Sequence, residues 1–183
     1  MEWLSTLLEF INPAKIIGFF KRPKLEIYYD EKETYHKVPD LTYNGILGNF
    51  GHVMVRNTGK TVAKNCVGKL RLIELYKDNK FQAVPEYRNV MDLKWAHEED
   101  FYPKDIEPDD NIRLDLCYVH DGHNIIHFFT KKYPGGNQTD FLPGLYKVKI
   151  KVNSDNAKSI EKYFKVEYKS GDFNSFKIDD IKI

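Results

Sequence analysis

The stretch LYKVKIKV, residues 145–152, decides the fold because apolar and charged side chains alternate along it after the turn signal Pro143-Gly144. One face of this stretch presents three lysines, and the other presents the apolar side chains Tyr146, Val148, Ile150 and Val152. A period of two with one apolar and one charged face is typical of a half-buried antiparallel β-strand. The stretch therefore predicts a strand whose apolar face covers a core.

A second stretch, VRNTGKTVAKN at residues 55–65, predicts a strand, a tight turn and another strand. About eight or nine apolar runs separated by turn residues recur along the chain, which favours an all-β sandwich over alternating strands and helices. Residues 30–39 are expected to be irregular, and residues 92–110 to be a loop with short extended pieces around 93–96. The expected strands cover residues 25–29, 50–57, 66–75, 81–90, 112–120, 123–130, 145–152, 163–168 and 176–181.

The alternating positions of these strands define a core shared by two packed antiparallel sheets. Burying one such side chain stabilises the fold by roughly 1.5–3 kcal/mol, so the alternation also sets the strand register. The expected core residues are Val53, Val55, Leu70, Leu72, Leu114, Leu116, Val148, Ile150, Phe164 and Val166.

The second stretch carries the pattern Val-x-Asn-x-Gly-x-x-x-Ala-x-Asn, formed by Val55, Asn57, Gly59, Ala63 and Asn65. Together with Pro143-Gly144-Leu145-Tyr146, this pattern resembles the immunoglobulin-like modules of the CARDB kind, the cell-adhesion-related domains of bacteria and archaea. The resemblance implies an immunoglobulin-like β-sandwich that is non-catalytic and mediates binding or display.

Three residues of the pattern also have expected structural roles that do not depend on the resemblance. Gly59 is expected to supply a positive φ angle in the turn. Asn57 can hydrogen-bond to the local backbone from a position that otherwise faces the core. Ala63 is small enough for a close approach between strands.

The charge balance and the cysteine count narrow the class of protein. Lys and Arg number 28 against 27 Asp and Glu, and a formal net charge of +1 gives no electrostatic support for a dedicated nucleic-acid binder. The two cysteines, Cys66 and Cys117, are too few for a disulfide-stapled mini-domain. Both lie in apolar strand patterns, so we expect buried, reduced thiols. A single disulfide between them is the alternative.

Residues 3–20, WLSTLLEFINPAKIIGFF, resemble a targeting or membrane element. The segment lacks a basic start and a small-residue cleavage site, so a cleaved signal peptide is not expected. As a helix it would extend roughly 27 Å, short of a bilayer core of about 30 Å. Glu9, Asn12 and Lys15 lie near its middle, and Pro13 would interrupt a helix there. The pattern predicts an amphipathic, broken helix that lies on an apolar surface.

Three apolar surfaces fit this segment: a membrane interface, a partner protein and the domain's own sandwich. If it spanned a membrane, Lys21-Arg22-Pro23-Lys24 would hold the following domain in the cytoplasm. We therefore expect an apolar helical segment at residues 1–22 and an immunoglobulin-like domain at residues 23–183. The expected interaction residues are Trp3, Leu4, Leu7, Leu8, Phe10, Ile11, Ile16, Ile17, Phe19 and Phe20.

The run His120-Asp121-Gly122-His123 is the metal-like cluster of the sequence. If Asp121-Gly122 forms a two-residue hairpin turn, the two histidines face each other with Cβ atoms roughly 4.5–5.5 Å apart. His120 and His123 are therefore candidate metal ligands. His127 would lie about 13 Å along the strand, too far to complete a site.

The sequence contains no local pattern for nucleophilic, phosphate-binding or zinc-dependent catalysis. We expect a non-enzyme without a cofactor: a binding module that is membrane-proximal or docked on a protein partner, with its domain facing the cytoplasm. One alternative is an accessory subunit whose residues 1–20 lie in a protein groove. Another is a metal- or sugar-binding sandwich that uses residues 120–127.

Overall fold

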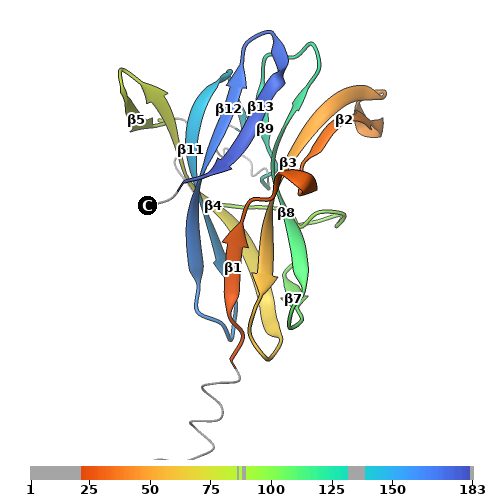
Figure 1. Ribbon diagram of the computed structural model, residues 1–183, viewed down its shortest axis with the longest axis vertical. Helices are drawn as coiled ribbons and strands as arrows, with labels where there is room; N and C mark the ends of the chain where they lie inside the picture. The colour runs from red at the N-terminus through yellow and green to blue at the C-terminus, as the bar shows by residue number, and fades with distance from the viewer. Residues whose placement is uncertain (1–21, 86, 88–89, 132–138, 182–183) are drawn as a thin grey trace, which may run out of the picture.

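Two antiparallel sheets face each other in the computed structural model, which describes residues 22–85, 87, 90–131 and 139–181 (Figure 1). The all-β sandwich expected from the alternating strands is confirmed. Within those ranges two 3₁₀ turns occur, η1 (Glu31–Glu33) and η2 (Leu41–Tyr43), and no helix has the length and hydropathy to cross a membrane. The expected N-terminal helix and its interaction residues from Trp3 to Phe20 lie outside the described residues.

The first sheet, called sheet A, is built around the long strand β3 (Ile46–Asn57). Its order is β1 (Leu25–Tyr28), β3, β8 (Asn111–His120), β9 (Ile126–Phe128) and β10 (Asp140–Phe141). The edge strand β2 (Tyr35–Asp40) also pairs with β3, so the prediction that residues 30–39 are irregular is wrong. Most side chains of β2 are exposed. The strand therefore has no buried apolar face, and its sequence lacks the alternating pattern that predicts a strand.

The second sheet, called sheet B, is built around β4 (Ala63–Lys77) and β11 (Gly144–Asn153). Its order is β13 (Asp172–Asp180), β12 (Ile160–Lys169), β11, β4 and β5 (Lys80–Ala83). The short strands β6 (Met91–Asp92) and β7 (Lys104–Ile106) pair with the remaining part of β4. All four apolar side chains of the alternating stretch in β11 are buried, as expected.

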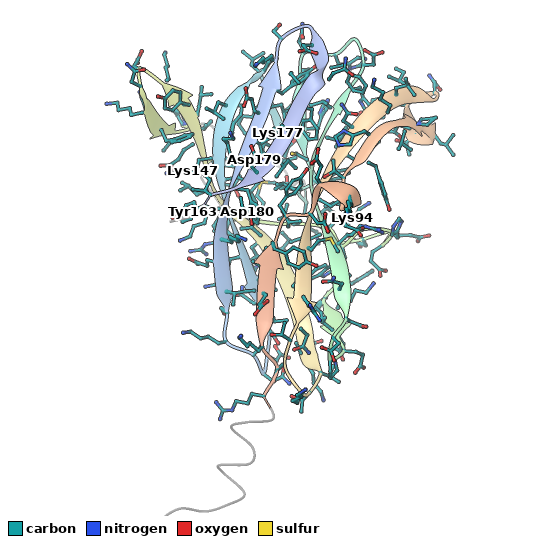
Figure 2. All side chains as sticks on the ribbon, in the orientation of Figure 1. Lys94, Lys147, Tyr163, Lys177, Asp179 and Asp180 are labelled. Carbon is teal, nitrogen blue, oxygen red and sulfur yellow. The ribbon has the colours of Figure 1, made fainter. Side chains whose placement is uncertain are left out.

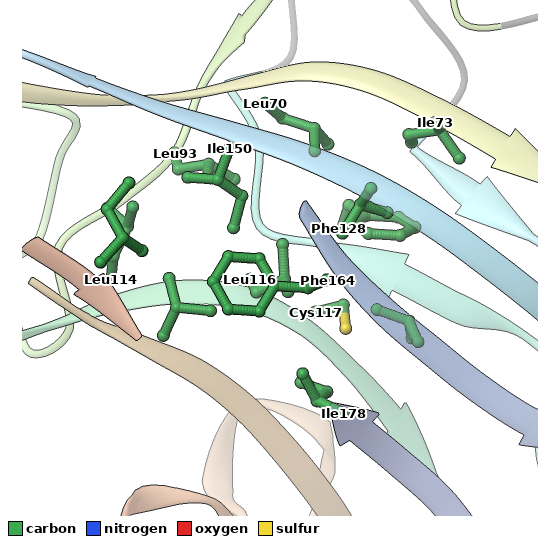
Figure 3. Close-up of a cluster of buried hydrophobic side chains, with 14 of the residues drawn as sticks. Leu70, Ile73, Leu93, Leu114, Leu116, Cys117, Phe128, Ile150, Phe164 and Ile178 are labelled. Atoms are coloured by element: carbon green, nitrogen blue, oxygen red, sulfur yellow. The ribbon is translucent and has the colours of Figure 1, made fainter. Parts of the chain in front are cut away.

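The core between the sheets contains nine of the ten residues expected there, among them Leu70, Leu114 and Phe164 (Figure 3). Leu72 is the exception, because it is only half-buried and Ile73 takes the inward position. The pairing of β4 with β11 shifts at this point, so that Arg71 is an extra residue without a partner opposite. One extra residue moves every later side chain by one position along the pleat.

A segment called the strap, residues 91–96, crosses from one sheet to the other. It begins as β6 beside β4 in sheet B and ends with a bridge between Trp95 and Leu114 of sheet A. Trp95 is buried, and its indole N–H donates to the carbonyl of Cys66 at 3.3 Å. The extended pieces expected around residues 93–96 are confirmed, and they form part of the core.

Both cysteines are free thiols in the buried interior, as expected. Burial raises the pKa of the Cys66 thiol to about 11, and burial also raises the pKa of Cys117. Both side chains are therefore protonated at neutral pH and pack as small apolar groups.

Candidate binding surfaces

The end of the sandwich at which β1 begins carries a hollow of about 750 Å³, called the N-terminal hollow. Three chain segments meet there: the start of β1, the turn between β3 and β4, and the turn between β11 and β12, at the bottom of Figure 1. The lining residues are Arg22, Pro23, Lys24, Thr58, Gly59, Lys60, Asp155, Asn156, Ala157 and Lys158.

Asn57 fixes the first two of these segments against each other. Its buried side-chain oxygen accepts hydrogen bonds from the backbone N–H groups of Lys24 at 3.1 Å and Gly59 at 3.0 Å. Its side-chain nitrogen donates to the carbonyls of Thr61 at 2.8 Å and Ile106 at 2.9 Å. One side chain thus pairs with four backbone groups, and the expected backbone-bonding role of Asn57 is confirmed.

Gly59 is required at the hollow for a reason that differs from the expected one. Its φ angle is not positive, so that prediction is wrong. A Cβ atom added to Gly59 would lie 2.4 Å from the backbone nitrogen of Lys24 and 2.5 Å from the carbonyl oxygen of Arg22. The absence of a side chain therefore allows the chain before β1 to lie directly against the turn.

The third segment is anchored by Asn156 and Ser154. Asn156 donates to the carbonyl of Val62 at 2.9 Å and accepts from the backbone N–H of Lys64 at 2.8 Å. The hydroxyl of Ser154 donates to the carbonyl of Lys64 at 2.8 Å. Both walls of the N-terminal hollow are thus held by bonds between side chains and backbone.

The outer face of sheet A carries a group of rings, called the imidazole face, which comprises Tyr43, Phe50, Tyr118, His120, His123 and His127. His120 is fully buried, and its Nε2 lies 2.9 Å from a carboxylate oxygen of Asp40. The ring centroids of His123 and His127 lie 5.7 Å and 6.1 Å from that of His120. The three histidines are therefore neighbours in space.

The position of His127 differs from the prediction. Strands β8 and β9 pair Tyr118 with His127, so residues 121–125 form a longer loop and Asp121-Gly122 is not a two-residue hairpin turn. The direct cross-strand pairing of His120 with His123 is therefore also wrong. Their rings meet because the loop folds back, with the His123 N–H donating to the His120 carbonyl at 3.2 Å.

The imidazole face does not assemble a metal centre from the described residues. His127 lies 2.8 Å from a carboxylate oxygen of Asp140, as His120 does beside Asp40. Nowhere in the described ranges do three or more His, Cys, Asp or Glu side chains group as a metal ion requires. The sequence candidates His120 and His123 gain no third ligand among the described residues, and the His–Asp contacts join strands of sheet A, β8 to β2 and β9 to β10.

A further buried His–Asp pair lies on the same outer face. His52 and Asp115 are directly opposite on β3 and β8, with 2.8 Å between Nδ1 and the carboxylate. The ring of Tyr35 packs edge-on against His52, and the pair borders a shallow hollow of about 260 Å³. The pair therefore cross-links two central strands.

The outer face of sheet B carries paired charges. Each lysine of the alternating stretch in β11 has a glutamate beside it; the pairs are Lys147–Glu74, Lys149–Glu161 and Lys151–Glu161. Figure 2 shows Lys147 and Tyr163 on this side of the molecule, with Lys94 on the side of sheet A. The three lysines of this stripe therefore share two glutamates from the neighbouring strands β4 and β12, which compensate most of their charge.

The N-terminal hollow is the feature that inspection of the sequence misses. Its cations Arg22, Lys24, Lys60 and Lys158 come from three separate segments that no local pattern connects. The available signal is the Val-x-Asn-x-Gly pattern, which marks the turn that forms one wall.

Comparison with models of protein families and with curated proteins finds no match for this chain. The resemblance to CARDB modules has support from the two-sheet antiparallel architecture alone.

Proposed function

We propose that this protein is a non-enzymatic binding module with an immunoglobulin-like sandwich, held at a membrane surface by its apolar N-terminal segment. The observation that carries the proposal is the position of Arg22 at one end of the sandwich, in the lining of the N-terminal hollow. The described core cluster is drawn from residues between Leu25 and Ile178 and already joins both sheets. In the sequence, the apolar residues 3–20 come directly before this end of the sandwich.

The composition of the segment supports an interfacial position. Polar positions recur every three or four residues among ten large apolar side chains, which leaves a broad apolar face on a helix. Apolar surface of several hundred Å² usually marks a contact site. Glu9 and Lys15 favour a helix that lies in the interface over one that crosses it. Lys21, Arg22 and Lys24, which follow the segment, favour a position of the sandwich on the cytoplasmic side of the membrane. A groove on a protein partner is the competing surface.

Co-sedimentation of the full-length protein with phosphatidylcholine vesicles tests the proposal. The combined substitutions Leu7→Ser and Ile16→Ser should weaken binding about a hundredfold or more, because two apolar side chains leave the interface. Leu41→Ser is the matched control, since Leu41 is 88% exposed on η2 and should leave binding unchanged. Wild-type protein that stays in the supernatant both with these vesicles and with vesicles that contain phosphatidylglycerol would contradict membrane association.

A further inference from the structure

We infer that the N-terminal hollow binds the phosphate groups of anionic lipids, an inference that rests on the proposed membrane association. Among the described residues, one carboxylate, that of Asp155, lines the hollow, together with the four cations Arg22, Lys24, Lys60 and Lys158. The whole chain has a formal net charge of only +1. Positive charge is therefore concentrated at the hollow, while acidic residues elsewhere in the chain bring the net charge close to zero.

The acidic groups near the hollow compensate its cations only in part. Asp155 accepts a hydrogen bond from the side-chain amide of Asn65 at 2.6 Å. Lys24 lies 3.3 Å from Glu26, but both side chains are largely exposed, where an ion pair contributes little. Lys60 and Lys158 are exposed, and no carboxylate of the described ranges lies within ion-pair distance of either. A phosphate would therefore meet Lys60 and Lys158 without competition from a carboxylate of the described ranges.

Hydrogen bonds between side chains and backbone fix the three chain segments that carry these cations relative to one another. Asn57 and the close approach at Gly59 join the segment of Arg22 and Lys24 to the turn of Lys60. Asn156 joins the turn of Lys158 to the start of β4. A bound phosphate therefore does not have to order three separate segments, which lowers the cost of binding.

The position of the hollow in the chain points to a lipid as the source of the phosphate. Lys21 and Arg22 directly follow Phe20, the last of the apolar residues expected at the interface. A segment lying in the interface would bring the hollow to the level of the lipid phosphates, within the roughly 8–10 Å over which charges act in physiological salt. Each cation near an anionic surface raises membrane partitioning about fivefold.

Vesicle binding by the full-length protein tests this inference, with phosphatidylcholine alone compared with phosphatidylcholine mixed with phosphatidylglycerol. The combined substitutions Lys60→Gln and Lys158→Gln should weaken binding to the mixed vesicles about 25-fold, at about fivefold for each cation, and leave binding to phosphatidylcholine unchanged. Lys32→Gln with Lys80→Gln is the matched control, because it removes the same charge at exposed positions that do not line the hollow. Binding of this control should stay within about twofold of wild type.

The outcomes separate this inference from the proposed function. Equal wild-type binding to both vesicle types, or equal losses in the two double variants, would overturn the lipid site and leave anchoring by residues 1–20 intact. A wild-type protein that binds neither vesicle type would overturn both. Binding of inorganic phosphate at the hollow without vesicles, together with equal wild-type binding to both vesicle types, would show that the hollow takes a soluble anion and would overturn the lipid assignment.

Discussion

The side-chain oxygen of Asn57 lies 3.1 Å from the backbone nitrogen of Lys24, and this hydrogen bond joins the chain before β1 to the turn after β3. We expect Asn57→Ala to lower the free energy of unfolding by about 3 kcal/mol, because buried backbone groups lose their partner. Urea denaturation measures the change. Asn156→Ala is the control: its site is exposed, water replaces the lost bonds, and it should cost below about 1 kcal/mol. If Asn57→Ala and Asn156→Ala lowered the free energy of unfolding equally, burial of the Asn57 side chain would not explain its contribution.

Gly59→Ala tests the close approach between the turn and the chain before β1. The new Cβ atom would lie 2.4 Å from the backbone nitrogen of Lys24, so we expect a loss of about 3 kcal/mol in the free energy of unfolding. Gly122→Ala is the comparison, because Gly122 has a φ angle of +73° and open space around its Cβ position. It should cost about 1 kcal/mol from the left-handed backbone alone. A Gly59→Ala protein as stable as wild type would contradict the contact.

Removal of residues 1–20 should leave a folded sandwich. The described residues form both sheets around a shared core, so we expect the melting temperature to change by only about 2 °C. Circular dichroism and a thermal melt measure the fold and the stability. Loss of the cooperative melt would mean that the segment belongs to the core of the domain, and the anchoring proposal would then be wrong.

The two thiols should be unreactive in the native protein. The pKa of Cys66 is raised to about 11 by burial, so about one thiol in a thousand is ionised at pH 8. Burial also raises the pKa of Cys117. A thiol-specific reagent should label neither cysteine in the native state and both in urea. Fast native labelling, or a mass lower by two hydrogens without reductant, would contradict the buried free thiols.

Asp40 should contribute stability that acid removes. Burial pushes its pKa up, but hydrogen bonds from Thr42 and His120 outweigh burial and hold the pKa below the ordinary value of 3.8. The contribution is therefore present above pH 3.8 and is lost as the pH falls through the lowered pKa. We expect Asp40→Asn to cost about 1–2 kcal/mol at pH 7 and progressively less below pH 4 in urea titrations.

Asp121→Asn is the control for the acid titration, because Asp121 lies exposed in the loop after β8. Its cost at pH 7 should be near zero, because the side chain is exposed. If the cost of Asp40→Asn stayed constant down to about pH 2, the stability that Asp40 contributes would not depend on its ionised carboxylate. The hydrogen bonds from Thr42 and His120 would then not explain that contribution.

The fold was predictable where one face of a strand is buried and the pattern runs without interruption. Residues Tyr146 to Val152 show this, since alternation alone gives their burial correctly. Leu72 marks the limit, because the extra residue Arg71 shifts the register and nothing in the local sequence signals it. Strand β2 was missed because an exposed edge strand needs no apolar face.

The candidate surfaces depend on contacts that no local pattern contains. Arg22 and Lys158 line one hollow although they lie at opposite ends of the chain. His127 approaches His120 because the loop between β8 and β9 is longer than the Asp-Gly pair suggests. The role of Asn57, in contrast, was predictable, because a polar amide at a core-facing position needs backbone partners nearby.

Because the strap crosses between the sheets, the long stretch from β5 to β8 cannot be shortened as though it were a surface insertion. A deletion there would remove Trp95 from the interior and take away the backbone partner of Leu114. The turn at Gly122 is a better place for an inserted peptide or tag, because the space around its Cβ position is open. A smaller version of this domain would have to lose loops at its ends and keep the crossing intact.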